Sequence, residues 1–350
     1  MPRLVALDAL RGLAAVMVFA VHAQLPGVHE ALPGLDAGVL IFFALSGYLL
    51  YAPFSASMRS GRPVELRTYA VRRLLRIAPA YLVASFVISG AWSPGLLSDP
   101  IAIATTWQSP ILVVWTLQLE VAFYVLLPLI AYGLRRLDTA TRVRLLLIGS
   151  AGSIGITAIV MAALHGTLGY VPGPSVSTIA SYIWAFIPGM VVAELEQRGS
   201  FAKPLPVIAP AVGFGLIGVS SALNTPSYFD VPASVGAALL IAFVVSRPTA
   251  GRRFHRAFLA AGALSYSVYL WHEAILDAVD RPTPTWMGGL IALILTIAVA
   301  AVMYVVVERP ALRLAHWMRR SRLRLPEPRT ADLPGFDQGF VPIAVRSESR

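Results

Sequence analysis

Long uncharged runs, separated by short clusters of charge, are the main pattern along this chain. The five longest runs without Asp, Glu, Lys or Arg are 37–58, 77–98, 145–193, 204–229 and 282–307. A helix needs about 20 apolar residues to cross a bilayer, so each run can form one span and the longest can form two. Weaker apolar stretches lie near 9–24, 110–134, 231–246 and 257–279. The pattern therefore predicts an all-α integral membrane protein, a bundle of about ten transmembrane helices.

The positions of the cations support this count independently. Cytoplasmic loops of membrane proteins carry an excess of Lys and Arg. Here the cations fall in every second connection between the expected spans, and Arg281 is the exception among the other connections. This alternation requires an even number of spans, with both termini in the cytoplasm. The cation-rich segments are 59–76, 135–144, 198–203, 247–256 and 309–329.

Composition restricts the class of protein further. The chain is 57% hydrophobic and 13% charged, with a mean hydropathy of +0.71, whereas soluble domains have about 25% charged residues. A soluble enzyme is therefore excluded, and the net charge of +10 is explained by membrane topology rather than by nucleic-acid binding. The absence of cysteine excludes thiolate metal sites and a cysteine nucleophile. We expect a multi-pass plasma-membrane protein with a transmembrane domain at 1–315 and a basic, disordered cytoplasmic tail at 316–350.

The first expected span carries ionisable residues, which are costly inside a membrane and usually face an internal cavity. Arg11 and His22 are separated by about three helical turns and about 16 Å, so they lie near one face. Asp8 precedes Arg11 by one turn and can pair with it. The pattern favours a functional stripe with a titratable imidazole; the alternative is an anchoring arginine and a histidine that bonds to a neighbouring helix.

Two further groups of charge are candidates for function. Glu120 has apolar residues on both sides, so it must find a cation or become protonated; the alternative to a functional role is a buried salt bridge. Arg73 and Arg76 share a helix face, with Arg72 beside them, and such a cluster can bind phosphates. Simple anchoring at the cytoplasmic surface explains the arginines equally well.

Other polar and small residues in the apolar runs have structural explanations. Ser46 and Gly47 form a small pair that allows two helices to approach closely. His272 follows a segment rich in Tyr and Trp, which are common at membrane interfaces, and we expect it to line or brace a cavity.

Six segments, taken together and in order, resemble the membrane-bound acyltransferase 3 family. An arginine and a histidine separated by ten residues form the family signature, as Arg11 and His22 do here. Thr116 stands where the family usually has serine, and Val121 stands where it often has a second acidic residue. The matching segments are 7–22, 38–48, 73–81, 115–124, 266–272 and 307–310.

The resemblance implies a ten-helix membrane enzyme that transfers an acyl group, commonly acetyl, from acyl-CoA to a hydroxyl. The implied acceptors are carbohydrates, glycolipids or the sugar of a secondary metabolite. Many relatives carry an additional SGNH hydrolase-like domain, which we do not expect here because the tail is too short.

The resemblance also implies roles for individual residues. His22 would be the catalytic base, and Glu120 would orient His22 or act as a second base. Acyl-CoA is a co-substrate, and neither a metal nor a permanently bound cofactor is expected. The expected substrate-binding residues are Asp8, Arg11, Ser46, Arg72, Arg73, Arg76, Trp115, Tyr124, Tyr269 and His272.

A multi-span transporter or proton-coupled carrier is the alternative class. Buried Asp, Arg, His and Glu residues suit a carrier equally well on topology alone. Carriers often contain an internal repeat with paired broken helices, and the sequence contains no such repeat. A purely structural scaffold would explain the topology but not the charges inside the spans.

Overall fold

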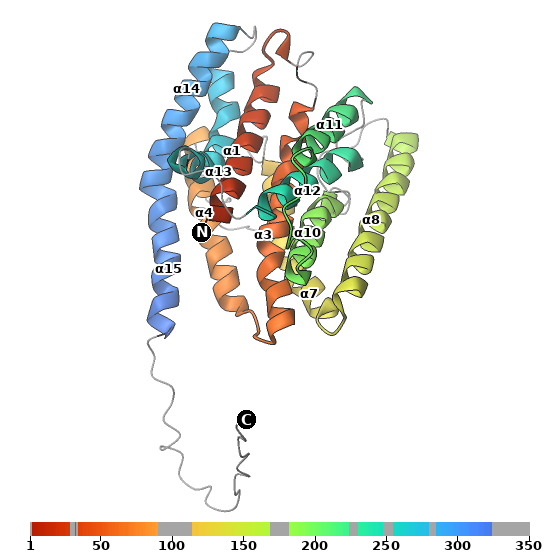
Figure 1. The fold of residues 1–350 in the computed structure, drawn as a ribbon. Helices are drawn as coiled ribbons and strands as arrows, with labels where there is room; N and C mark the ends of the chain where they lie inside the picture. Colours follow the sequence, from red (N-terminus) through yellow and green to blue (C-terminus); the bar gives the residue numbers. More distant parts are fainter. Residues whose placement is uncertain are drawn as a thin grey trace, which may run out of the picture.

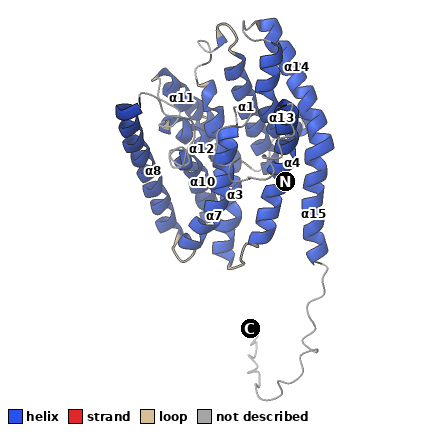
Figure 2. Ribbon diagram, turned by 180° about the vertical axis from the view of Figure 1, so that it is seen from behind, coloured by secondary structure: helices blue, strands red, loops and turns tan. Residues whose placement is uncertain are grey.

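A computed structural model gives the structure and describes residues 2–28, 32, 34–89, 114–168, 182–223, 230–247, 255–279 and 285–323. Throughout this part the chain is helical, without strands, which confirms the predicted all-α class (Figure 2). Short 3₁₀ turns, η1 (Leu35–Ala37) and η2 (Ile183–Phe186), lead directly into α3 and α10. The α-helices are α1 (Pro2–Ala23), α3 (Gly38–Ser60), α4 (Leu66–Ser89), α7 (Val114–Leu134), α8 (Thr139–Leu168), α10 (Ile187–Arg198), α11 (Ala209–Ala222), α12 (Val231–Val245), α13 (His255–Val279), α14 (Trp286–Met303) and α15 (Arg309–Leu323).

Five helical segments among the described residues are long and apolar enough to cross a membrane. The remaining helices overlap the other expected spans, but they are shorter or carry more charge. The count of ten spans and the cytoplasmic termini therefore stay predictions. The five segments are Ala6–Ala23, Leu35–Ser60, Trp115–Leu134, Thr139–Ile159 and Trp286–Ala315.

The helices run roughly side by side, and several arginine-rich segments lie at the same end of the bundle. The turn from α3 to α4, the turn from α7 to α8 and the last residues of α15 all lie at the lower end in Figure 1. The last residues of α1 and the start of α14 lie at the opposite end. This arrangement agrees with the pattern expected for a cytoplasmic, positively charged end.

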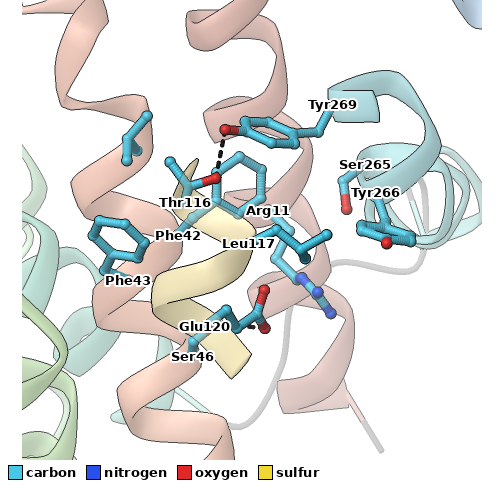
Figure 3. A pocket seen from close by; sticks show the side chains of 11 residues that line it. Arg11, Phe42, Phe43, Ser46, Thr116, Leu117, Glu120, Ser265, Tyr266 and Tyr269 are labelled. Atoms are coloured by element: carbon cyan, nitrogen blue, oxygen red, sulfur yellow. Dashed lines mark hydrogen bonds between the residues drawn. The ribbon is translucent and has the colours of Figure 1, made fainter. Parts of the chain in front are cut away.

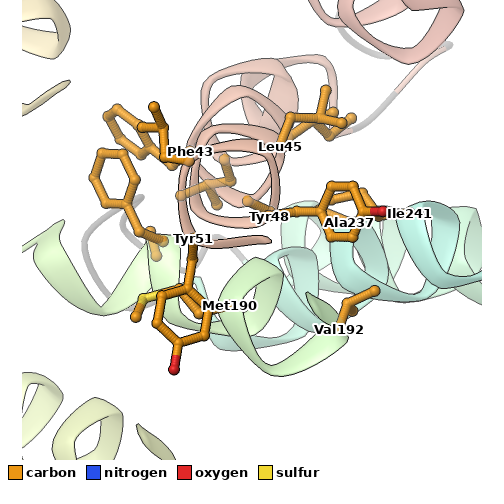
Figure 4. Packing of buried hydrophobic residues seen from close by; sticks show 14 of the residues in the cluster. Phe43, Leu45, Tyr48, Tyr51, Met190, Val192, Ala237 and Ile241 are labelled. Carbon is orange, nitrogen blue, oxygen red and sulfur yellow. The ribbon is translucent and has the colours of Figure 1, made fainter. Parts of the chain in front are cut away.

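The helix α3 lies at the centre of the main core. Its buried side chains, among them Phe43 and Tyr51, pack against residues of α10 and α12 such as Met190 and Ile241 (Figure 4). A methyl group on Gly47 would lie 1.9 Å from the carbonyl oxygen of Phe186. The two backbones are therefore in direct contact at Gly47, and the close helix approach expected from the sequence is confirmed.

The helix α1 packs against α13, which lies far from it in sequence. Glycines make this approach possible: a methyl group on Gly12 would lie 2.5 Å from Cβ of Ala261, and one on Gly262 would lie 2.4 Å from Cβ of Asp8. Because the two helices lie so close, the stripe on α1 that holds Arg11 faces the polar residues of α13.

The last helix is continuous from α14 through a π-helical turn, η5 (Tyr304–Glu308), into α15. It runs on to Leu323, whereas the transmembrane domain was expected to end at 315. The first residues of the expected tail are therefore helical, and the tail from 324 onward lies outside the described residues. A second boundary also differs: α4 begins at Leu66, so Arg72, Arg73 and Arg76 lie inside a helix rather than in a connection.

A buried ion pair joins α8 to α10 close to the turn between α7 and α8. Nη2 of Arg142 donates to Oε2 of Glu194 at 2.9 Å, and the hydroxyl of Tyr51 donates to Oε1 of the same carboxylate at 2.8 Å. Arg142 also donates to the Leu137 carbonyl at 2.6 Å and to the Thr139 hydroxyl at 3.0 Å. The sequence indicated only a topological role for this arginine, but the structure buries it as a structural residue.

Candidate active site

Two adjoining pockets between α1, α3, α4, α7 and α13 contain most of the residues expected to form the site. The first has a cavity volume of about 50 Å³ and the second a cavity volume of about 60 Å³. Because the two pockets share four lining residues, they adjoin each other, and together they form the cavity of the helix bundle. The shared residues are Arg11, Ser46, Glu120 and Tyr266.

Glu120, on α7, is held by residues from its own helix and from α3. Its Oε1 accepts hydrogen bonds from the Tyr124 hydroxyl at 2.5 Å and from the Ser46 hydroxyl at 3.3 Å. In Figure 3, the side chains of Glu120 and Arg11 extend into the same space from opposite walls. The Glu120 carboxylate is thus hydrogen-bonded and lies within electrostatic range of a guanidinium, as the sequence required of a carboxylate in this position.

Arg11 is half-buried and brings positive charge to the middle of the cavity. It lies within electrostatic range of Asp8, Arg76 and Glu120. Asp8 itself faces α13 at Gly262, next to Arg11 but outside the lining of the two pockets. Asp8 is therefore close enough to Arg11 to interact with its charge, as the sequence predicts, and Glu120 is a second carboxylate near the same guanidinium.

The arginines of α4 divide into two groups. Arg73 and Arg76 line the second pocket, whereas Arg72 is exposed on another face of the helix. The Arg73 guanidinium lies 5.7 Å from the ring centre of Tyr69 and 5.8 Å from that of Tyr124, which holds it at the cavity wall. A phosphate-bearing ligand in this pocket would meet Arg73, Arg76 and Arg11, but not Arg72.

A pair of hydroxyl groups lies in the wall of the first pocket, at the end of the cavity away from Arg73 and Arg76. Oγ1 of Thr116 and the hydroxyl of Tyr269 lie 2.5 Å apart, and both residues line the first pocket (Figure 3). The ring of Tyr269 lies 5.7 Å from that of His272, centre to centre. His272 is 1% exposed and packs behind this end of the cavity; it was expected among the substrate-binding residues, but it is outside the lining of the two pockets.

His22 lies next to His272, beyond the described lining of the two pockets. The two imidazole rings are 4.9 Å apart at their centres and nearly perpendicular. Nδ1 of His22 is 2.8 Å from the Val18 carbonyl oxygen, and Nδ1 of His272 is 2.7 Å from the Tyr269 carbonyl oxygen. A carbonyl can only accept, so Nδ1 carries the proton in both rings and each Nε2 holds a lone pair when the ring is neutral. Such an Nε2 can take up a proton.

The contacts of Glu120 and His22 differ from one expectation. Glu120 was expected to orient His22 or to act as a second base. In the described contacts, Val18 and His272 hold His22, while Ser46 and Tyr124 hold Glu120. Among the described contacts, the imidazole of His22 therefore packs against the ring of His272 and is not bonded to Glu120.

Trp115 was expected in the substrate site but packs beside it. Its ring lies 5.1 Å from that of Tyr182 and 6.4 Å from that of Phe43. These contacts support the wall formed by α3 and α7.

Several residues of the site were not expected from the sequence. Tyr266 and Ser265 of α13 line the cavity, and Glu308 contacts Arg76 from outside it. Tyr266 and Glu308 occur in segments that carry the family resemblance, and that position was the one signal that could have identified them. Within the part of the chain that the structure describes, no group of three or more His, Asp or Glu side chains could hold a metal ion.

Comparison with known proteins gives a consistent result. The family model for the acyltransferase domain of the acyltransferase 3 family matches residues 4–305. The O-acetyltransferase OatA of Staphylococcus aureus (strain NCTC 8325 / PS 47) is 23% identical over 350 residues, which cover 87% of this chain and 56% of that protein. The peptidoglycan O-acetyltransferase OatA of Listeria monocytogenes is 23% identical over 356 residues, which cover 87% of this chain and 55% of that protein.

This chain spans about half the length of the curated relatives it matches. No solved structure matches it. The family model nevertheless covers nearly all of the described helices, including every helix that contributes to the cavity. The chain therefore belongs to the acyltransferase 3 family.

Proposed function

We propose that this acyltransferase moves an acetyl group from acetyl-CoA to a hydroxyl group of a carbohydrate or glycolipid. The observation that carries the proposal is the order of the charged and polar side chains along the cavity. Arg73 and Arg76 line the second pocket, Thr116 and Tyr269 line the first, and His22 lies beyond both pockets in ring contact with His272. Such a cavity suits a polyanionic donor that enters from the cytoplasm and an alcohol that reacts deeper in the membrane.

Each part of the donor has a matching region of the cavity. Arg73 and Arg76 would bind the phosphates of acetyl-CoA, because guanidinium groups match phosphate oxygens in charge and geometry. The pantetheine arm and thioester would extend past Arg11 and Glu120 toward Thr116 and Tyr269. This end of the cavity adjoins His272, which is in ring contact with His22.

The chemical step needs one base and no cofactor. Nε2 of His22 would take the proton of the acceptor hydroxyl while the oxygen attacks the thioester carbonyl carbon. The new C–O bond forms, the C–S bond breaks, and the leaving thiolate takes the proton back from the imidazolium. Direct transfer of this kind is simpler than an acetyl-histidine intermediate, which would add a second step.

The proposed acceptor is a sugar hydroxyl. One matched relative is named as a peptidoglycan O-acetyltransferase, so peptidoglycan sugars are the first acceptors to test.

Purified protein in nanodiscs, radiolabelled acetyl-CoA and peptidoglycan fragments provide the direct test. We expect an acetyl ester to form, and we expect His22→Ala to reduce the rate by about 100-fold or more, since a general base contributes at least that much. His22→Gln, which keeps the size of the side chain but cannot take the proton, should be equally inactive. Full activity of His22→Ala would show that another group is the base, whereas net movement of an acceptor across the bilayer without ester formation would favour a carrier.

A further inference from the structure

Glu308 is a buried carboxylate in a π-helical turn that the proposed mechanism does not use. Its side chain is 1% exposed, and it closes the turn Tyr304–Glu308 between α14 and α15. A π turn adds one residue to a helical turn, so it changes the face on which the following side chains lie, and such turns are common at functional sites. Burying a charge in this position is unfavourable unless a partner compensates for it.

The partners of Glu308 come from two other helices. Its Oε2 accepts a hydrogen bond from Nη1 of Arg76 at 3.2 Å, and its Oε1 accepts one from the Ser267 hydroxyl at 2.5 Å. The carboxylate is therefore held on one oxygen by α13 and contacts α4 with the other. Its position is fixed independently of any ligand.

A second residue of α13 restrains Arg76 from another direction. The Arg76 guanidinium lies 5.7 Å from the ring centre of Tyr266, and the Tyr266 hydroxyl donates to the Ile77 carbonyl at 2.9 Å. The backbone next to Arg76 and its guanidinium are thus both held by one side chain. Arg76 remains 16% exposed on the pocket side.

Arg76 lines the second pocket, so N–H donors that Glu308 does not use can meet a ligand there. A guanidinium has five N–H donors, and Glu308 accepts from Nη1 alone. A long arginine side chain that is already restrained loses less conformational entropy when it binds. The contacts of Glu308 therefore favour a ready-made phosphate-binding conformation of Arg76.

We propose that Glu308 is a positioning residue for the acetyl-CoA site. Ser267 fixes the Glu308 carboxylate, and this carboxylate holds Arg76 in the conformation that binds a donor phosphate. The inference rests on the proposed function, because it requires acetyl-CoA to be the ligand of Arg76. Glu308 itself does not touch the reacting atoms.

The test is the steady-state kinetics of Glu308→Gln in nanodiscs. We expect KM for acetyl-CoA to rise by up to about tenfold, because an Arg76 side chain that is no longer held must be ordered when the donor binds, and ordering one long side chain weakens binding by up to about this factor. The value of kcat and KM for the sugar acceptor should stay within about twofold of the wild type, because the reacting groups are untouched. Ser267→Ala, which removes one hydrogen bond, should give a smaller rise in KM for acetyl-CoA.

Glu194→Gln is the matched control, because it removes a carboxylate from a buried arginine pair away from the cavity. This variant should lose stability without a selective change in KM for acetyl-CoA. If Glu308→Gln does not fold, Ser267→Ala and Glu308→Asp measured in the same way decide the question.

Direct binding of acetyl-CoA separates the two levels of the proposal. If the wild type binds acetyl-CoA and Glu308→Gln binds equally well, the positioning role is wrong and the proposed function stands. If Arg76→Lys alone and Arg76→Lys with Glu308→Gln lose the same affinity, Glu308 acts through Arg76, as inferred. If the wild type neither binds nor consumes acetyl-CoA, both the function and the positioning role are overturned.

Discussion

Among the described residues, two arginine–glutamate ion pairs lie inside the helix bundle, and they differ in their surroundings. Arg142 and Glu194 are 7% and 0% exposed, and the arginine also donates to a carbonyl and a hydroxyl beside it. Arg76 and Glu308 are 16% and 1% exposed, and Arg76 faces a cavity. One pair is enclosed and locks three helices together, whereas the other leaves its cation open to a ligand. The ion pair is common to both arginines, so it does not distinguish their roles. An arginine whose other N–H donors bond inside the protein has a structural role, whereas an arginine that faces a cavity can bind a ligand with them.

The largest expected effect is on the enclosed pair. Arg142→Met leaves the Glu194 carboxylate buried without its cation, and loss of one partner of such a pair costs about 3–5 kcal/mol. We expect the variant to unfold at a much lower temperature or denaturant concentration than the wild type in the same micelles. Its transfer rate per folded molecule should be unchanged. A variant as stable as the wild type would show that the pair adds little to the fold.

The next effect separates the two pairs by replacing both partners with apolar residues. Arg142→Met with Glu194→Leu should recover most of the lost stability, because no unpaired charge stays buried. Arg76→Met with Glu308→Leu should also be stable, but its affinity for acetyl-CoA should fall about tenfold or more, which corresponds to at least about 1.4 kcal/mol. Thermal unfolding and acetyl-CoA binding measured on both double variants provide the comparison. Equal binding by the two would remove the distinction between an enclosed and an open pair.

The sequence alone predicted much of the fold, because run length and charge placement act locally. Each expected span overlaps a helix, and Gly47 marks a close helix contact as predicted. The start of α4 was missed because arginines read as a connection, yet a helix can carry them on a face that lines a polar cavity. Charge thus marks the end of an apolar run without marking the end of a helix.

The site was predicted in part, for a similar reason. The stripe with Arg11, and the carboxylate of Glu120, follow from the cost of charge inside a membrane. The pairing of Arg76 with Glu308 joins two residues far apart in the chain, and no local pattern in one sequence indicates that contact. The contact between His22 and His272 depends likewise on the packing of α1 against α13.

The smallest expected effect concerns the turn that supplies two of the acceptors around Arg142. Asp138 lies outside the spans, and hydrogen bonds from the Thr141 hydroxyl and backbone, and from the Ala140 backbone, lower the pKa of its carboxyl. A carboxyl whose pKa is lower in the folded state contributes stability above its unfolded pKa, and this contribution is lost as the pH falls through the folded pKa. Asp138→Asn keeps an acceptor at the start of α8 but does not titrate. The wild type should therefore lose slightly more thermal stability than Asp138→Asn below about pH 4. If the unfolding temperatures of the two proteins fall in parallel as the pH is lowered, the Asp138 carboxylate adds nothing to the stability of the turn beside the enclosed pair.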